Sequence, residues 1–192
     1  AGIALGVAVW VGIHAANQSV LYTFQRTIDH VAGTTQLQIS SGRAGFPEEV
    51  LERVQALPEV RVAAPVIEAV VDPGLPGQGN LLLLGVDMTG DQSLRRYELE
   101  GEVLDDPLVF LAQPDSLLVT REFADRHGLE SGSRIPLETM AGPRRFAVRG
   151  ILKPGGLAQA FGGNLAVMDL YAAQAVLGRG RTLDRIDIAL RD

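Results

Sequence analysis

The side chains of this chain that could do chemistry are three histidines and a few serines and carboxylates. His14, His30 and His127 are far apart and form no HExxH-like motif, whereas a metal site needs several ligands at close spacing. No GxSxG nucleophile motif is present, and Ser131 and Ser133 flank a glycine in an expected turn before a strand. The sequence therefore predicts neither a catalytic residue nor a bound metal.

His127 stands at the end of an expected helix, two positions after Asp125. Residues two apart on a helix do not face each other, so this pair is not the core of a catalytic triad. We expect the His127 side chain to bind the last carbonyl groups of its helix.

Glycine-rich and acidic segments raise the question of a phosphate or cation site. GLPGQG at 74–79 and the glycine pairs beginning at 155 and 162 lack the GK[ST] ending of a P-loop, and none has the strand-then-helix order of a dinucleotide-binding turn. The acidic group between Glu98 and Asp106 lacks the spacing of a calcium loop, and we expect a solvated face. No cofactor is therefore expected.

The charge balance bears on the class of partner. The formal net charge is −6, so the chain lacks the basic excess with which proteins bind nucleic-acid phosphates, and no nucleic-acid partner is expected. The chain has no cysteine, which removes disulfides, thiol nucleophiles and thiolate metal ligands.

One loop, residues 153–163, carries apolar side chains between two glycine pairs. Leu157 and Phe161 on a mobile tip would be able to contact lipid, a lipidated substrate or a partner. The alternative is that both side chains pack back onto their own domain.

The elements that would position these residues begin with an apolar segment. Residues 1–13, AGIALGVAVWVGI, contain no charge. As a helix they would span about 20 Å, short of the roughly 30 Å hydrocarbon core of a bilayer, so we expect the chain to begin partway through a transmembrane helix. Small residues four apart, which let membrane helices approach closely, are Gly2, Gly6, Ala8 and Gly12. The alternatives are a signal-peptide remnant or an ordinary buried helix.

Helical periodicity continues beyond the apolar run. Val20, Leu21, Phe24, Ile28 and Val31 recur at three- and four-residue steps. One helix to about residue 32, stopped by Gly33, would leave the membrane as a stalk.

The next segment predicts a β-α-β unit followed by another strand. A strand at 35–40 precedes a helix that begins at Pro47 and turns Val50, Leu51, Val54 and Leu57 to the core. The β-rich run 60–71 contains Pro65, which favours an edge strand or a bulge. Residues 81–86 predict a further strand.

The rest of the chain predicts a β-rich middle and a second β-α-β unit. The middle has a strand at 117–119, a helix capped by Thr120 and ended by Gly128, and a hairpin of 134–138 with 145–151. The second unit has a strand at 164–168, a helix at 169–177 and a strand at 183–190. We predict an α+β fold in which the two β-α-β units form one four-stranded sheet, with two helices on one face and the middle nested within it.

Three segments taken together resemble a known family. They are GIALGVAVWVGIHAANQS, LLVTREFADRHGLESGSRIPLETMAGPRRFAVRGIL with its V-x-G at 148–150, and GGNLAVMDLYAAQAVLG with LDRIDIAL. They look like the extracytoplasmic core domain of ABC transporter permeases of the MacB/FtsX type. The resemblance implies the end of a first transmembrane helix and a stalk at 1–33, a porter-like subdomain at 34–86 and 164–192, and an inserted sabre-like subdomain at 87–163.

The resemblance also implies a function without catalysis in this segment. A separate cytoplasmic ATP-binding subunit hydrolyses ATP, and the stalk carries motion to the periplasmic domain, from about residue 33 onward, to move or release cargo. The implied partners are that subunit, a second permease copy or homologous half, membrane lipid, and hydrophobic or lipid-linked cargo. The alternative is a membrane-tethered scaffold that recruits or activates an envelope enzyme. The resemblance transfers no site residue, and without a second membrane helix this segment alone is not expected to transport cargo or bind ATP.

Overall fold

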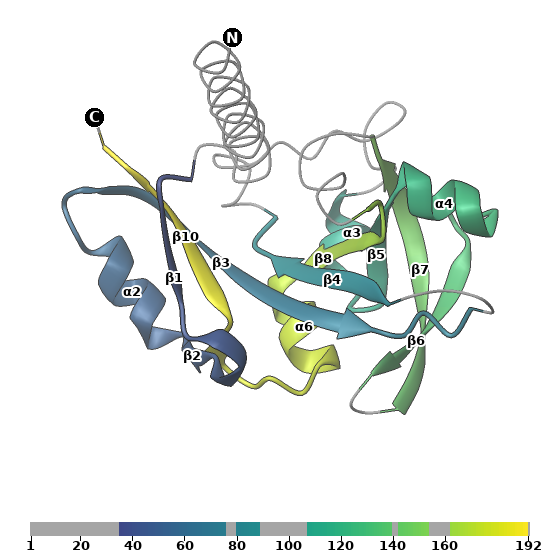
Figure 1. Ribbon diagram of the computed structural model, residues 1–192, viewed down its shortest axis with the longest axis horizontal. Coiled ribbons are helices and arrows are strands. Elements are labelled where there is room, and N and C mark those ends of the chain that lie inside the picture. Colours follow the sequence, from purple (N-terminus) through teal and green to yellow (C-terminus); the bar gives the residue numbers. More distant parts are fainter. Residues whose placement is uncertain (1–34, 76–79, 89–106, 140–141, 154–161, 192) are drawn as a thin grey trace, which may run out of the picture.

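The computed structural model describes residues 35–75, 80–88, 107–139, 142–153 and 162–191 (Figure 1). The strands are β1 (Leu37–Ser40), β2 (Phe46–Pro47), β3 (Val60–Val71), β4 (Leu81–Val86), β5 (Ser116–Thr120), β6 (Arg134–Thr139), β7 (Gly142–Leu152), β8 (Leu165–Asp169), β9 (Thr182–Leu183) and β10 (Arg185–Leu190). The helices are the 3₁₀ turn η1 (Gly42–Ala44), α2 (Glu49–Gln55), α3 (Pro107–Ala112), α4 (Arg121–His127) and α6 (Leu170–Val176).

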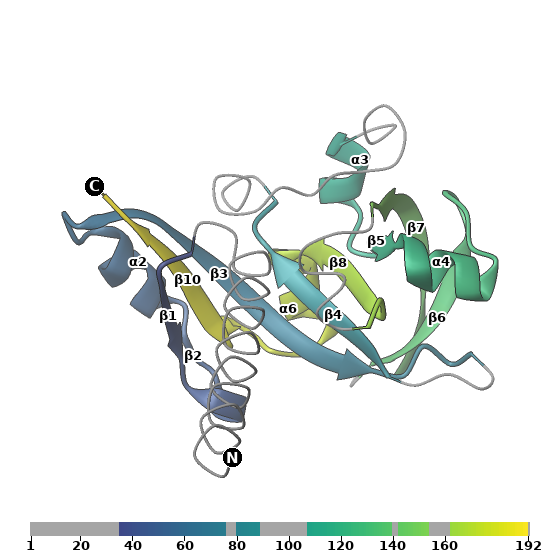
Figure 2. The same ribbon diagram turned by 45° about the horizontal axis from the view of Figure 1, so that its top comes forward.

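Eight strands form one mixed sheet in the order β1-β10-β3-β4-β8-β5-β7-β6, and β2 pairs with β9 separately. The sheet is thus wider than the four strands expected, because the β-rich middle continues it instead of forming a sheet of its own. The junction is short: β5 and β8 pair only at Leu118 with Val167 and at Val119 with Ala166. Figure 2 shows β1, β10 and α2 at one end of the molecule and β5, β6, β7 and α4 at the other.

Pro65 occupies a local edge position, one of the two expected alternatives, because in the described residues only its β10 side has a partner strand. β3 runs without a break through Pro65, which is buried opposite Ile186 of β10. Successive residues of a strand direct their backbone groups to alternate sides. Because the carbonyl of Val66 accepts a bond from the Asp184 amide on the β10 side, the nitrogen of Pro65 faces the β4 side, where pairing begins only at Val66 with Val86. Proline therefore costs no ladder hydrogen bond here.

The expected start of the first helix at Pro47 is wrong. Pro47 pairs with Thr182 in the β2–β9 ladder, and the amide of Glu48 donates to the carbonyl of Arg181 at 3.0 Å. This pairing holds the backbone extended, so α2 begins only at Glu49. The predicted apolar side of the helix is confirmed at Val54, which is buried, whereas Leu57 is 50% exposed.

Both faces of the sheet carry hydrophobic residues. The larger core joins α2, α4 and α6 to one face through Val54, Phe123 and Ala173, as expected for helices packed on one side. A smaller cluster contains Leu84, Val167 and Phe110 of α3. Strands buried on both faces read as continuous apolar runs, which is why LLLLGV in β4 shows no alternation.

Gly85 explains how closely α6 lies against β4. A Cβ atom on Gly85 would stand 2.3 Å from the Cβ of Ala173, closer than any real contact of this kind. Only glycine lets the helix and strand backbones approach this far. The pair fixes the position of the predicted second helix, whose N-cap is Asp169.

The two ends of the described chain are neighbours. β1 and β10 pair antiparallel, with Leu37 opposite Ile188, so residue 35 and residue 191 lie at the same end of the sheet (Figure 1). The amide of Gln36 donates to the Ile188 carbonyl at 2.8 Å. Arg191 extends the junction to β3 with a bond from its Nε to the carbonyl of Val60 at 3.1 Å.

The expected membrane helix and stalk, including Gly2, Gly6, Ala8 and Gly12, lie outside the described residues, and so do His14, His30 and the acidic group from Glu98 to Asp106. Within the described parts of the chain, no helix has the length and apolar character needed to cross a membrane.

Candidate functional site

The base of the apolar loop is the first candidate. Leu157 and Phe161 themselves lie outside the described residues, but the end of the loop at residues 162–164 is described. Arg126 of α4 donates from Nη1 to Asn164 Oδ1 at 2.8 Å and from Nη2 to the Gly162 carbonyl at 3.0 Å. One guanidinium group thus fixes the point where the loop rejoins β8.

Thr120 fixes the same point from the start of α4. Its hydroxyl donates to the Gly163 carbonyl at 2.5 Å, while its Oγ1 accepts a bond from the Phe123 amide at 3.4 Å, which confirms the predicted cap. Gly163 has φ of +78°, and a Cβ there would stand 2.6 Å from the Cβ of Glu122. The loop base therefore requires glycine for both backbone conformation and space.

His127 does not bind the carbonyl groups at the end of α4, so that expectation is wrong. The Ala124 carbonyl is instead taken by backbone amides, including that of Leu129 at 2.9 Å. The His127 ring packs on Phe123 with centroids 4.5 Å apart, and its buried Nε2 has no hydrogen-bond partner among the described residues. Burial, and secondarily the charge of Arg126, lower the pKa of His127.

Asp125 confirms that the sequence neighbours do not form a dyad. Its carboxylate pairs with Arg121 at 3.1 Å along α4, one turn away. Over the described segments, no group of three or more histidine and carboxylate side chains is arranged to hold a metal ion.

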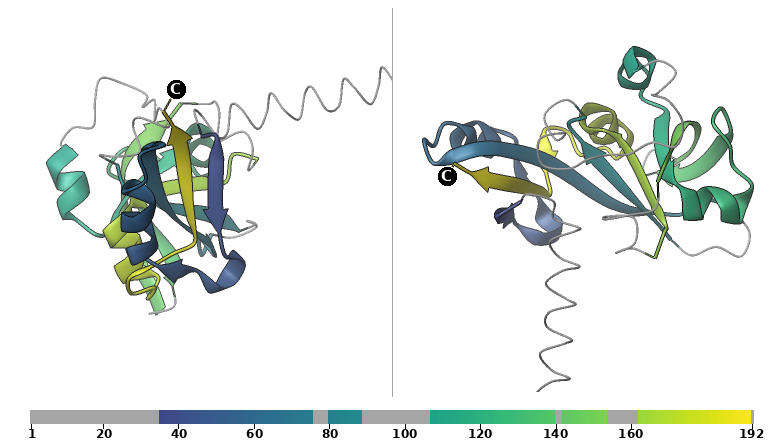
Figure 3. Two further views of the ribbon diagram at one scale, coloured as in Figure 1. Left: turned by 90° about the vertical axis from the view of Figure 1, so that its left-hand side faces the viewer. Right: turned by 90° about the horizontal axis from the view of Figure 1, so that it is seen from above.

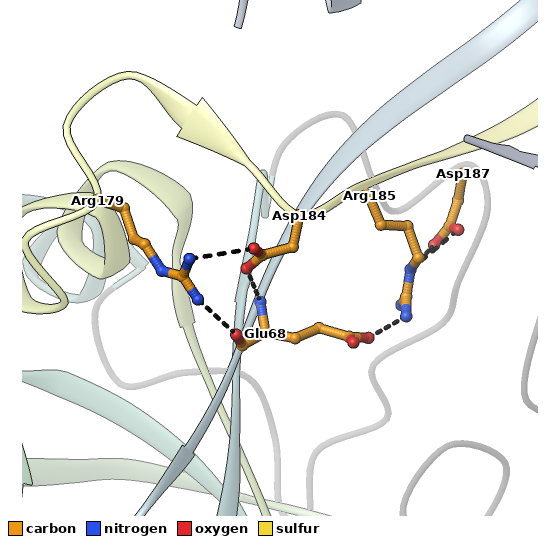
Figure 4. A network of polar contacts seen from close by, with 5 residues as sticks. All are labelled: Glu68, Arg179, Asp184, Arg185 and Asp187. Atoms are coloured by element: carbon orange, nitrogen blue, oxygen red, sulfur yellow. Dashed lines mark hydrogen bonds and ion pairs between the residues drawn. The ribbon is translucent and has the colours of Figure 1, made fainter. Parts of the chain in front are cut away.

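A second candidate is a set of paired charges in the middle of the sheet, called here the charged cluster (Figure 4). Its members are Glu68, Arg179, Asp184, Arg185 and Asp187. Arg179 pairs with Asp184 at 3.4 Å, and Asp184 Oδ2 accepts a hydrogen bond of 2.8 Å from the amide of Glu68. Arg185 pairs with the Glu68 carboxylate and, at 3.1 Å, with Asp187.

The charged cluster holds the backbone of one residue from two directions. The Glu68 carboxylate accepts a hydrogen bond from Arg185. The Glu68 carbonyl accepts one from Arg179 Nη2 at 3.4 Å, and the Glu68 amide donates one to Asp184. Each carboxylate of the cluster has a guanidinium partner. Its chemistry is therefore cross-linking of elements by charge-assisted hydrogen bonds.

No local sequence pattern predicts the charged cluster. The pairing of Glu68 with Asp184 spans 116 residues, which no local pattern reports. A signal was present in β10, where Arg185 and Asp187 alternate with isoleucines and so share a face. That face is not solvated, because Asp187 is only 3% exposed.

Residues 1–192 match the sequence profile of the family described as the MacB-like periplasmic core domain. The chain belongs to this family. A curated relative, an uncharacterised ABC transporter permease protein of Mycobacterium tuberculosis, is 26% identical over all 192 residues, and the chain spans 22% of that relative's length. The resemblance to MacB-type permease domains is thus confirmed.

Solved structures agree with this assignment at the level of the fold. The extracellular domain of the noncanonic ABC-type transporter YknZ from Gram-positive bacteria matches with a TM-score of 0.61 and 11% identity, over 81% of this chain and 82% of that chain. The periplasmic region of MacB from Actinobacillus actinomycetemcomitans matches with a TM-score of 0.58 and 10% identity, over 86% of this chain and 78% of that chain. The chain is an extracytoplasmic domain of a MacB-type ABC transporter permease.

The V-x-G motif of this core domain has a structural explanation. Leu117 of β5 pairs with Val148, and Leu118 pairs with Gly150, so Arg149 between them is an extra residue, a β-bulge in β7. The bulge turns the Arg149 guanidinium to Gln113, in the segment between α3 and β5.

Proposed function

We propose that this core domain couples ATP hydrolysis by a cytoplasmic subunit to movement or release of hydrophobic or lipid-linked cargo outside the membrane. The observation that carries the proposal is the pairing of β1 with β10, which puts residues 35 and 191 at one end of the sheet. A stalk before residue 35 and a membrane helix after residue 192 would both join the domain there. Displacement of either segment would pull directly on a backbone ladder.

The ladder gives such a displacement a continuous route into the domain. β10 pairs on its other side with β3, which in turn pairs with β4. Strands paired by several hydrogen bonds move together more readily than segments joined by loops. In this proposal residues from about 33 onward are extracytoplasmic, residues 1–33 are the membrane exit and stalk, and the porter-like parts (34–86 and 164–192) drive the sabre-like part (87–163).

The proposed contact with cargo is the loop that carries Leu157 and Phe161. Arg126, Thr120 and Gly163 fix the end of this loop that joins β8, so movement of β8 and α4 would move that end. In this proposal the core domain itself carries out no catalysis. The support for this is membership in a permease domain family.

The test of the coupling uses the full-length permease purified from membranes in mild detergent, with co-purifying proteins identified by mass spectrometry. We expect a stoichiometric partner that has a GxxxxGK[ST] motif and ATPase activity. A soluble envelope protein captured in its place would overturn the transporter proposal and indicate a membrane-tethered scaffold that recruits or activates an envelope enzyme.

The test of the loop is Phe161→Ser in the same permease, with Tyr171→Ser as the matched control. Tyr171 is an aromatic residue on α6 that is 65% exposed, so its loss tests whether any exposed ring matters. We expect Phe161→Ser to reduce ATP-dependent export of a lipid-linked probe while thermal stability is unchanged. Unchanged export with a lower melting temperature would show that the ring packs on its own domain.

A further inference from the structure

β3 changes partners halfway along its length. Its residues from Val60 to Val66 pair with β10, and its residues from Val66 to Val71 pair with β4. Val66 is the single residue of β3 paired on both sides, with Arg185 and with Val86. Figure 3 shows β3 as a long strand that continues from the part with β10 and α2 into the part with β4, β8 and α4.

The sheet therefore consists of two segments that overlap at one residue. The terminal segment contains β1, β10 and the first half of β3, and the distal segment contains the second half of β3 with β4, β8, β5, β7 and β6. α6 belongs with the distal segment, because Ala173 packs on Gly85 of β4. A strand with a neighbour on only one side is free to bend and twist more than one held on both.

The charged cluster lies across this overlap. Glu68 stands two residues beyond Val66 in the distal segment, and Arg179 follows α6. Asp184, Arg185 and Asp187 belong to β10 or immediately precede it, in the terminal segment. The Arg179–Asp184 and Arg185–Glu68 ion pairs and the bond from the Glu68 amide to Asp184 thus all join one segment to the other.

These contacts differ in kind from the apolar ones that also cross the overlap. Ile67 and Ile186 pack in one core there. Apolar packing is non-directional and tolerates small rotations, whereas a charge-assisted hydrogen bond fixes a direction and a distance. The Asp184 side chain is 12% exposed and that of Arg185 is 16% exposed, so water screens these pairs only in part.

We propose that β3 flexes on either side of Val66, where it has a neighbouring strand on one side only, and that the charged cluster is a latch that holds the terminal and distal segments in one relative orientation. Only the role of the latch rests on the proposed function: a latch at this point would decide how much motion entering through β1 and β10 reaches the distal segment. The latch itself is a property of the domain, so it can be tested without transport.

The experiment measures the distance between the two segments by pulsed electron paramagnetic resonance in the full-length permease. Spin labels are placed by Glu52→Cys on α2 and Arg134→Cys on β6, both exposed positions, and residues 1–192 contain no other cysteine. Cysteines elsewhere in the permease are replaced by serine. The latch variant is Glu68→Gln with Asp184→Asn, which removes both charges and keeps an oxygen as acceptor for the Glu68 amide.

The matched control is Glu48→Gln. Glu48 forms an ion pair with Arg181 at 3.1 Å, and these two residues are also far apart in the sequence. This ion pair joins the start of α2 to the segment before β9 and does not involve β3. We expect the distance distribution to widen at least twofold in the latch variant and to stay unchanged in the control. Arg179→Gln, which removes the contacts to Asp184 and to the Glu68 carbonyl, is measured as well in case the double variant does not fold.

An unwidened distribution in a folded latch variant and in Arg179→Gln would overturn the latch. Equal widening in Glu48→Gln would overturn it too, because the effect would then follow from any lost ion pair. Export is measured on the same samples. A wider distance distribution with unchanged export in the latch variant supports the latch and contradicts the proposed coupling. An unchanged distance distribution with intact export contradicts the latch alone.

Discussion

The amide of Leu190 donates a hydrogen bond of 2.6 Å to the side-chain Oε1 of Gln36, 154 residues away in the chain. This bond closes the sheet at the end where the chain enters β1 and leaves β10. Leu37, the next residue of β1, is 52% exposed, so side-chain packing contributes little there. At this end β1 is therefore held mainly by hydrogen bonds, while Ile39 further along the strand packs against the core.

Replacing Gln36 with alanine is expected to loosen β1 from β10. The loss of one hydrogen bond corresponds to about 1 kcal/mol of unfolding free energy. Hydrogen exchange followed by mass spectrometry should show faster exchange in peptides covering β1 and β10. Gln38→Ala, at an exposed position of the same strand, is the control, and equal exchange in both variants would contradict the role of Gln36.

Gly85→Ala is expected to destabilise the domain by about 2 kcal/mol, because the new methyl group overlaps Ala173. Urea unfolding gives the free energy. The same substitution in an Ala173→Gly background should cost far less, since the opposing methyl group is then absent. A cost that is equal in both backgrounds would mean that the two residues do not limit the approach of α6.

Thr120→Val is expected to lower the unfolding free energy by about 2 kcal/mol. The substitution removes both the cap of α4 and the hydroxyl bond to the Gly163 carbonyl at a buried position. Thr120→Ser keeps the oxygen and should retain most of the stability in urea unfolding. If serine and valine are equally destabilising, the methyl group and not the hydroxyl is what matters.

The stability of the domain is expected to fall as the pH is lowered through about 6.5, the ordinary histidine value, in part through His127. Burial and Arg126 lower the pKa of His127 in the folded state, so between that lowered pKa and 6.5 the unfolded chain binds more protons. Urea unfolding at pH 7.5 and 5.5 should show a larger loss for the wild type than for His127→Gln. Equal losses would assign the pH dependence to other groups.

The local elements followed from the sequence because their causes are local. Thr120 and Gly128 bound α4 as predicted, since a cap and a left-handed stop act within one turn. The hairpin of β6 and β7 was predicted within a few residues for the same reason. Family membership could also be predicted from the sequence, because it depends on the order of such local segments.

The errors arose where a distant partner decides the local structure. Pro47 is extended and not helical because Thr182 of a distant strand pairs with it. The burial of Asp187 likewise depends on the strands beside it.

The sequence by itself thus determined α4, α6, the β6–β7 hairpin and the family, through periodicity, caps and glycines that act over a few residues. Only the tertiary structure decided that the β-rich middle extends the same sheet, that residues 35 and 191 are neighbours, and that five charges meet around Glu68. The physical reason is that strand pairing and ion pairing join residues far apart in the chain, such as Val119 with Ala166 and Glu68 with Arg185. Their partners are fixed by how the whole sheet assembles, and no pattern within one segment specifies them.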